Sequence, residues 1–230
     1  MLSVILVGVV SESATAAQPA DHVVLLHGLA RSSRSMRTLE ARLTAEGYRV
    51  HNLDYPSRSA AADELIGLLA RRVAECCSDG RSVHFVGHSL GAILARAYLA
   101  TESPVAVGRV VQLAPPNGGS EIVDRWGDQW WFRSFFGPTG ARLGTGADAL
   151  PAALPRPDYE LGVVAATRSI NPLGSYLLPG DDDGAVTVAR THVDGEADFI
   201  AVAATHTFVM RHADAVDATV RFLRSGRFTE

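Results

Sequence analysis

The feature that most constrains this chain is a stretch in which an apolar strand pattern passes directly into a helix pattern. Residues 83–91 read Val-His-Phe-Val-Gly-His-Ser-Leu-Gly, and residues 92–99 continue with small and apolar residues at helical spacing. Because glycine has no Cβ, Gly87 and Gly91 allow a strand and a helix to approach closely around a sharp turn. The turn would expose Ser89 at its tip, below helix amides that favour an anion. The alternative interpretation is a glycine-rich turn with an ordinary surface serine.

The pattern around this turn predicts an α/β protein with a mostly parallel sheet and helices on both faces. Apolar strand patterns alternate with helical patterns along the chain, and no repeat or linker interrupts them. About six strands are predicted, at residues 21–26, 48–53, 83–88, 108–113, 161–166 and 198–203. In such a sheet, ligands bind at the carboxyl ends of the strands.

Length and charge fit one domain over residues 18–230. The chain has 230 residues, 47% of them hydrophobic, which is enough for one sizeable core. The net charge is −4 and the basic residues are scattered, so we expect no nucleic-acid partner and no polybasic membrane patch. Nothing in the sequence predicts an oligomeric state.

Residues 1–17 are predicted to be a signal peptide. An apolar run at residues 1–10 precedes small residues, and Ala14-Thr15-Ala16 fits a cleavage site, although no Lys or Arg precedes the run. The run is too short for an ordinary transmembrane helix. A secreted or periplasmic protein is expected, and a cytoplasmic protein with an apolar tail is the alternative.

A neutral serine hydroxyl needs a base in hydrogen-bond reach and a carboxylate that orients the base. Of the eight histidines, His206 is the best placed, because it follows the last predicted strand and so emerges at the same edge as Ser89. The other histidines lie in or beside strands, within the turn itself, or in loops and helix starts elsewhere. The alternative for His206 is an ordinary loop histidine.

The carboxylate is expected between the serine and the base in chain order. Residues 181–183 are three consecutive aspartates framed by glycines. We select Asp183, with Asp182 as the second choice, and a solvated acidic turn is the alternative. Asp194 and Asp198 are less well placed, since neither has the glycine frame.

Two backbone donors are needed to stabilise an oxyanion. The amide of Leu90, directly after the serine, would be one of them. The loop after the first strand reads His-Gly-Leu at residues 27–29, so the amide of Leu29 is the candidate for the other.

An insertion at about residues 120–160 contains many aromatic residues among glycines and prolines. Trp130, Trp131 and Phe132 are predicted to contact substrate as part of a lid or an acyl-binding wall, and a core-packing insertion is the alternative. Contact of this aromatic insertion with a membrane surface is a further expectation.

Four motifs occur in an order that resembles the α/β-hydrolase superfamily, and within it small bacterial lipases and esterases. They are residues 25–29 (Leu-Leu-His-Gly-Leu), 86–91 (Val-Gly-His-Ser-Leu-Gly), 180–186 (Gly-Asp-Asp-Asp-Gly-Ala-Val) and 205–206 (Thr-His). In such lipases the aspartate before a glycine-apolar-valine run is the acid, which supports Asp183. The loop at residues 114–120 matches only loosely, because it lacks the usual threonine-proline start and the histidine.

The resemblance implies an α/β-hydrolase fold with a minimal sheet, since two early strands of larger members have no counterpart here. It also implies esterase or lipase activity on a small-molecule or lipid ester, through an acyl-enzyme and without a cofactor. No metal site is predicted. A thioesterase or acyltransferase with the same three residues is the alternative, followed by a non-catalytic binding protein of this fold.

Cys76 and Cys77 are adjacent in the sequence. Neighbouring helical residues point in different directions, so a disulfide between the two is not expected. The pair also lacks metal-ligand spacing. We interpret both as small helix residues, and a disulfide between two molecules is the alternative.

Overall fold

The centre of the molecule is a six-stranded sheet with the order β2-β1-β3-β4-β5-β6. The computed structural model describes residues 21–101 and 105–229, and the predicted signal peptide lies outside them. The five strand pairings of the sheet are all parallel, which confirms the predicted fold class. The strands are β1 (His22–Leu26), β2 (Arg49–Leu53), β3 (Ser82–His88), β4 (Ala106–Leu113), β5 (Leu161–Arg168) and β6 (Asp198–Thr205).

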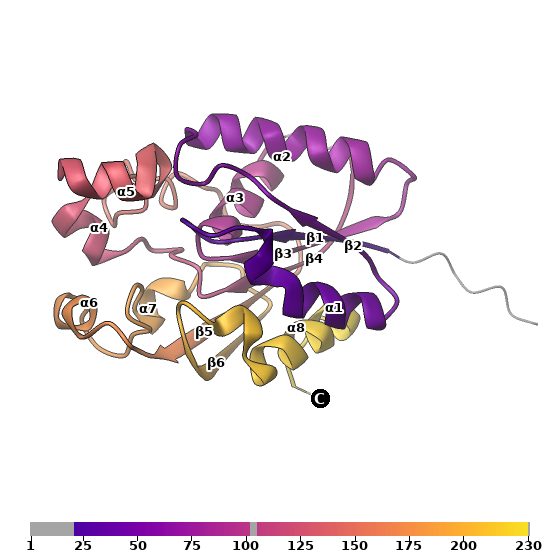
Figure 1. The fold of residues 1–230 in the computed structure, drawn as a ribbon. Helices are drawn as coiled ribbons and strands as arrows, with labels where there is room; N and C mark the ends of the chain where they lie inside the picture. The colour runs from indigo at the N-terminus through magenta and orange to yellow at the C-terminus, as the bar shows by residue number, and fades with distance from the viewer. Residues whose placement is uncertain (1–20, 102–104, 230) are drawn as a thin grey trace, which may run out of the picture.

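Helices cover both faces of this sheet. Figure 1 shows α2 and α3 on one face and α1 and α8 on the other. The α-helices are α1 (Arg37–Ala45), α2 (Ala62–Cys76), α3 (Leu90–Leu99), α4 (Glu121–Trp126), α5 (Trp130–Gly140), α6 (Pro172–Leu177), α7 (Val188–Thr191) and α8 (Ala213–Ser225), and the short 3-10 helices are η1 (Ser33–Met36) and η2 (Val209–Arg211).

Strand β1 shows why the sequence forms this arrangement. All five of its residues are buried, as expected for a strand with helices on both sides. Because side chains alternate along a strand, Val23 and Leu25 pack into the core beneath α1 and α8. Val24 and Leu26 pack into the core beneath α2 and α3. The near-continuous apolar run is therefore the signature of a central parallel strand.

The strand order indicates where along the sheet a ligand would bind. The chain passes from β1 to the edge strand β2 and then returns to β3 on the other side of β1. Ligands of open parallel sheets bind where the order reverses in this way, at the carboxyl ends of the strands. The loop that begins at His27 and the turn that carries Ser89 leave β1 and β3 at this point.

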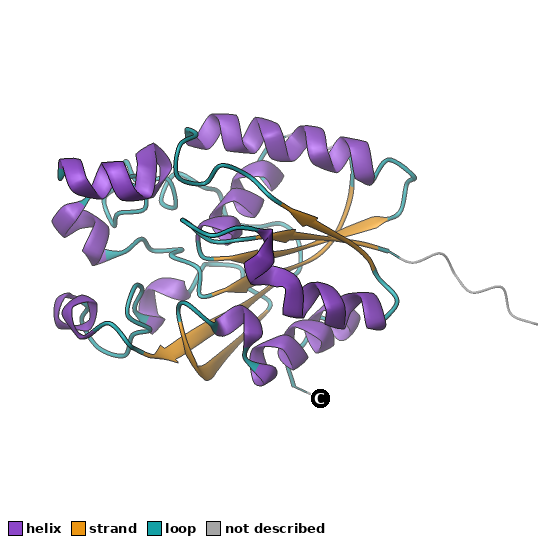
Figure 2. Cartoon of the chain, in the orientation of Figure 1, coloured by secondary structure: helices purple, strands orange, loops and turns teal. Residues whose placement is uncertain are grey.

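Two pairs of short helices lie beyond the carboxyl ends of the strands, α4 with α5 and α6 with α7 (Figures 1 and 2). The predicted insertion forms α4 and α5, and α5 bends at Gly137, which has a φ of 74° and precedes Pro138. Helix α6 lies between the fifth and sixth predicted strands, in a segment to which the sequence analysis assigns no strand. The sequence does contain residues typical of a helix start. The side chain of Asn171 accepts a hydrogen bond from the amide of Gly174, and Pro172 is the first helical residue.

Cys76 and Cys77 are joined by a disulfide, which corrects the expectation from the sequence. Helix α2 ends at Cys76, and Cys77 has a non-helical φ of −132° and ψ of 37°. The directions of neighbouring helical side chains therefore do not apply to this pair.

None of the helices in residues 21–101 and 105–229 is both long and apolar enough to cross a lipid bilayer.

Candidate active site

Ser89 occupies the sharp turn between β3 and α3. Its φ of 50° and ψ of −117° are an uncommon conformation for a residue with a side chain. A Cβ on Gly87 would come within 2.5 Å of the backbone of Ala92, and one on Gly91 would collide with the carbonyl oxygen of Leu26. The two glycines therefore permit the strand, the helix and β1 to meet, and this contact holds the serine in its strained conformation.

His206 lies directly beside this serine. It follows β6, and its Nε2 is 3.0 Å from the Oγ of Ser89. The side chain is 18% exposed, so the base can reach both the serine and a bound molecule. Residues separated by more than a hundred positions are brought together because β3 and β6 end at the same edge of the sheet.

Asp183, and not Asp182, contacts this histidine. Its Oδ2 accepts a hydrogen bond of 2.7 Å from Nδ1 of His206, while Oδ1 accepts from the backbone amides of Ala185 and Val186 at 3.0 and 2.8 Å. The carboxylate is fully buried. These three donors fix its orientation and offset the cost of burying its charge.

The other aspartates considered from the sequence have different partners. Asp182 Oδ1 accepts from the hydroxyl of Ser175 and from the amide of Gly184, both at 2.7 Å. Asp198 accepts from the amides of Phe199 and Phe228 at the other end of β6. These carboxylates shape their own turns and do not orient His206.

The two predicted oxyanion donors come from the first turn of α3 and from the loop after β1. Leu90 is the first residue of α3, so its amide has no acceptor within the helix. Leu29 follows β1 and lines the cavity above Ser89. The loop is held by His27, whose Nδ1 donates to the carbonyl of Gly28 at 2.9 Å and whose ring stacks on Tyr55 at 4.0 Å.

His88 takes part in the site in a way that the sequence analysis missed. Its Nε2 donates a hydrogen bond of 2.8 Å to the carbonyl oxygen of His206. Burial, reinforced by the neighbouring His206 ring, holds the pKa of His88 well below its usual range, so the ring is neutral. A Cβ on Gly28 would come within 2.6 Å of its Nδ1. The ring thus fixes the backbone of the base and packs against the loop that carries Leu29.

A pH-dependent stability follows from this neutral ring. In the unfolded chain His88 would take up a proton near pH 6.5, whereas in the folded chain it does not. The unfolded state therefore binds more protons below that pH, and the free energy of unfolding falls as the pH falls, by up to about 1.4 kcal/mol per pH unit. In His88→Gln, urea unfolding at pH 5 and pH 7 should give a smaller difference than in the wild type. Equal differences would contradict the assignment.

The loop after β4 helps to hold the turn that carries Asp183. The hydroxyl of Ser120 donates to the carbonyl of Ala185 at 2.7 Å, in the same turn whose amides hold Asp183. Nearby, the buried side chain of Asn117 accepts from Arg96 of α3 at 2.9 Å and donates to the carbonyl of Thr191 at 2.7 Å. This segment, which resembles the family only loosely in sequence, therefore links the helix after Ser89 to the loop of the acid.

A mostly apolar cavity of about 230 Å³ opens above the serine. Phe132 and Phe136 line it, as expected for residues one helical turn apart on α5. Trp130 and Trp131, which are also predicted to contact substrate, are 80% and 42% exposed and do not line this cavity. Their position on the outer side of α5 explains the difference. The cavity above Ser89 is lined mostly by apolar side chains, and its lining includes Leu29, Ser89, Ile122, Val123, Phe132, Phe136, Leu143, Val186 and His206.

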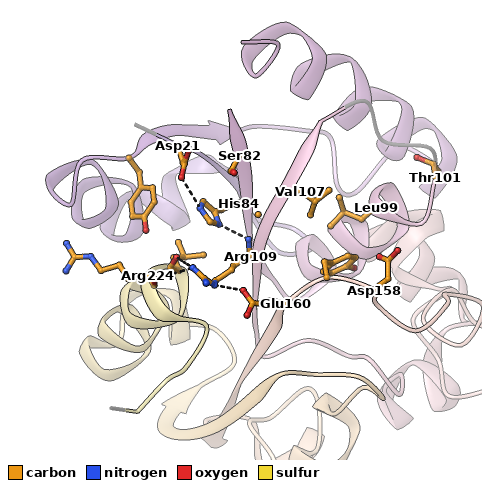
Figure 3. A pocket seen from close by; sticks show the side chains of 14 residues that line it. Asp21, Ser82, His84, Leu99, Thr101, Val107, Arg109, Asp158, Glu160 and Arg224 are labelled. Atoms are coloured by element: carbon orange, nitrogen blue, oxygen red, sulfur yellow. Dashed lines mark hydrogen bonds and ion pairs between the residues drawn. The ribbon is translucent and has the colours of Figure 1, made fainter. Parts of the chain in front are cut away.

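A larger hollow, of about 810 Å³, lies at the opposite edge, near the amino ends of the strands (Figure 3). Two contacts between polar side chains lie in it: Arg109 Nε is 2.6 Å from a carboxylate oxygen of Glu160, and Nε2 of His84 lies 3.9 Å from a carboxylate oxygen of Asp21. No residue of the Ser89 cluster lines it. The smaller cavity is therefore the one that fits chemistry at the serine.

The arrangement around Ser89 can activate a hydroxyl. Asp183 accepts from Nδ1 of His206, which leaves Nε2 free to accept the proton of the serine hydroxyl. The side chain of Asp183 is buried and that of His206 is mostly buried, so little water screens the electrostatic interactions between them.

Comparison with known proteins agrees with this fold. None of the curated proteins matches the sequence significantly. Among solved structures, the mature lipase BlEst2 of Bacillus licheniformis has a TM-score of 0.74 and 21% identity, covering 90% of this chain and 92% of the lipase. A metagenomic carboxyl esterase has a TM-score of 0.64 and 19% identity, with coverages of 83% and 65%. Phospholipase PlaB of Legionella pneumophila has a TM-score of 0.67 and 15% identity, with coverages of 90% and 59%.

Similarity at these identities establishes the fold. The sequence itself matches the family described as Alpha/beta hydrolase family over residues 23–224, which is most of the chain. Together with the parallel sheet and the serine turn between β3 and α3, this match shows that the chain belongs to the alpha/beta hydrolase family.

Proposed function

We propose that this protein hydrolyses carboxylic esters through an acyl-enzyme on Ser89. The observation that carries the proposal is the continuous set of contacts from Ser89 Oγ through His206 to Asp183, at the mouth of an apolar cavity. The hydrolase family and the esterases and lipases among the structural neighbours support ester hydrolysis in general.

The reaction has two steps. Ser89 Oγ attacks the ester carbonyl while Nε2 of His206 takes its proton, and the amides of Leu29 and Leu90 stabilise the oxyanion. His206 then protonates the departing alcohol, which leaves the acyl group on the serine. Water, deprotonated by the same nitrogen, attacks the acyl-enzyme and releases the acid and the free serine. Asp183 keeps the proton of His206 on Nδ1 and stabilises the imidazolium.

The cavity supports an apolar acyl group. It is small for a ligand pocket, and aliphatic and aromatic side chains form most of its wall. A short or medium acyl chain is therefore the substrate class that we propose. Burial of an acyl chain there contributes about 0.8 kcal/mol per methylene.

A substrate series tests the reaction and separates it from the alternatives. We expect p-nitrophenyl esters to be turned over faster than acyl thioesters, and added alcohols to yield less ester product than free acid. Faster turnover of thioesters would indicate a thioesterase, and predominant transfer to the alcohol would indicate an acyltransferase. No turnover of any of these by folded protein would contradict the proposal.

Chain-length preference should depend on Phe132 and not on Trp130. Phe132→Ala would enlarge the cavity, so the ratio of kcat/KM for octanoate to that for acetate should rise about tenfold. Trp130→Ala removes an exposed ring at the start of α5, so it should change this ratio by less than about twofold. Thermal unfolding of both variants checks that the fold is kept. Equal effects of the two substitutions would remove Phe132 from the acyl site.

Contact with a lipid surface is a second part of the proposal. Trp130 and Phe135 on α5 are 80% and 53% exposed, and Leu173 and Tyr176 on α6 are 62% and 86% exposed. Both helices lie beyond the carboxyl edge that holds the cavity (Figure 1). Aromatic and apolar side chains in such positions favour a membrane interface. Sedimentation with phospholipid vesicles, compared between the wild type and Trp130→Ser, tests this contact.

A further inference from the structure

A second cluster of reactive side chains lies away from the serine site. His22 is the first residue of β1, His51 lies in β2, and Cys77 directly follows α2. One ring nitrogen of each histidine and the sulfur of Cys77 all lie within 4.8 Å of one another. His22 and Cys77 are each 2% exposed, and His51 is partly exposed. Three side chains that bind metal ions thus share one buried position.

The fold explains how these residues meet. Strands β1 and β2 pair in parallel, with His22 opposite Arg49 and Val24 opposite His51. Because alternate residues share a face of the sheet, both histidines project from the face that carries Val24. Helix α2 covers this face, and its end brings Cys77 into the same core cluster as Val24. The three ligands come from separate elements, so their spacing in the sequence gives no metal motif.

Asp79 fixes the orientation of the buried histidine. Its Oδ1 lies 2.9 Å from Nε2 of His22, and its Oδ2 accepts from Arg49 at 2.7 Å. A carboxylate only accepts, so Nε2 of His22 carries the proton of this hydrogen bond and Nδ1 is the ring nitrogen left for another ligand. That Nδ1 faces Nε2 of His51 at 2.8 Å. Metal-binding histidines commonly donate their other ring nitrogen to a carboxylate in this way.

The state of the cysteines decides whether a metal ion can bind. In the structure Cys77 is joined to Cys76, and a disulfide sulfur is not a thiolate ligand. Reduction by a dithiol adds two electrons and two protons to the disulfide, gives two thiols, and converts the dithiol to its own disulfide. Cys77 then loses its proton when it binds the metal ion.

We propose that the reduced form of this protein binds Zn²⁺ through His22 Nδ1, His51 Nε2 and Cys77 Sγ, with water as the fourth ligand. Two imidazoles and a thiolate suit Zn²⁺, which prefers nitrogen and sulfur in a tetrahedral arrangement. Zn–N bonds of about 2.0 Å place two nitrogens about 3.3 Å apart, so the two rings separate slightly on binding. The proton that His51 Nε2 shares with His22 Nδ1 in the hydrogen bond then moves to His51 Nδ1, which frees Nε2 for the metal ion. His51 can make this movement, since it is partly exposed on the edge strand β2.

Two matched variants separate this site from a purely structural cysteine pair. Neither Cys76→Ser nor Cys77→Ser can form the disulfide, but only the first keeps the proposed thiolate ligand. We expect Cys76→Ser without an affinity tag to bind one Zn²⁺ with no reductant present, in competition with a chromophoric chelator. Cys77→Ser should bind at least about a hundredfold more weakly, as should Cys76→Ser carrying His51→Ala. Circular dichroism checks the fold of each variant.

The wild type provides the redox test. The wild type is first reduced by a phosphine, which is itself oxidised to the phosphine oxide with the oxygen of water, and the reductant is then removed without air. The reduced protein should bind one Zn²⁺, whereas the oxidised protein should not. Co²⁺ in place of Zn²⁺ should show a thiolate-to-cobalt charge-transfer band in Cys76→Ser and in the reduced wild type, but not in Cys77→Ser or in the oxidised wild type. Equal Zn²⁺ affinity of the two cysteine variants, or no binding by folded Cys76→Ser, would overturn the proposal.

Discussion

Replacing Ser89 with alanine is expected to lower kcat for a p-nitrophenyl ester by about a millionfold, to the level left by binding and the oxyanion donors. The variant lacks the oxygen that Nε2 of His206 contacts at 3.0 Å, so no acyl-enzyme can form. Steady-state release of p-nitrophenol, measured with highly purified protein, gives the ratio directly.

The fold of this variant should be retained. Alanine keeps the Cβ that the turn already accommodates at a φ of 50°, and the amide of residue 89 still bonds to the carbonyl of Leu113 at 2.9 Å. The thermal unfolding midpoint should therefore change by only a few degrees. Turnover within tenfold of the wild type in the folded variant would mean that another group attacks the ester.

Asp183→Asn is expected to lower kcat by about ten-thousandfold, whereas Asp182→Asn should change it by less than about tenfold. An amide at position 183 can donate to Nδ1 of His206, which moves the ring proton to Nε2 and leaves no lone pair for the proton of Ser89. Asp182 instead holds the turn through Ser175 and Gly184.

The matched pair makes this prediction specific. Both substitutions remove one negative charge from the same acidic run, so a general electrostatic effect would lower kcat equally in both variants. The kcat of each should be measured at saturating ester and at several pH values. A larger loss of kcat in Asp182→Asn than in Asp183→Asn would mean that Asp182, and not Asp183, is the acid.

The sheet could be predicted because its strands have strong local signals. The apolar run of residues 22–26 is continuous since helices cover both of its sides, and each such run is separated from the next by a helical pattern. The positions of Ser89, Asp183 and His206 at one edge follow from the parallel topology, which makes the ends of β3 and β6 neighbours of the same cavity.

The walls of the cavity could not be predicted in the same detail. The aromatic run on α5 has no clear periodicity, and the direction of each ring depends on how the helix lies over the cavity. Phe132 and Phe136 face inward while Trp130 and Trp131 face outward. Tertiary packing decides this, and composition alone gives only the number of rings available.

Two further features depend on contacts between distant elements. The hydrogen bond from His88 to the carbonyl of His206 spans 118 positions, and the sequence shows only that His88 lies within the turn that carries Ser89. The cluster of His22, His51 and Cys77 likewise arises where β1, β2 and the end of α2 meet. Such contacts become visible only when the fold is known.

The most direct test of the account is covalent labelling of the serine. Folded wild-type protein incubated with a fluorophosphonate should gain one adduct in its intact mass, and peptide fragmentation should place it on Ser89. Ser89→Ala should remain unlabelled, and Asp183→Asn should label much more slowly than Asp182→Asn. An adduct on another residue, or equal labelling of the wild type and Ser89→Ala, would contradict the claim that Ser89 is the nucleophile.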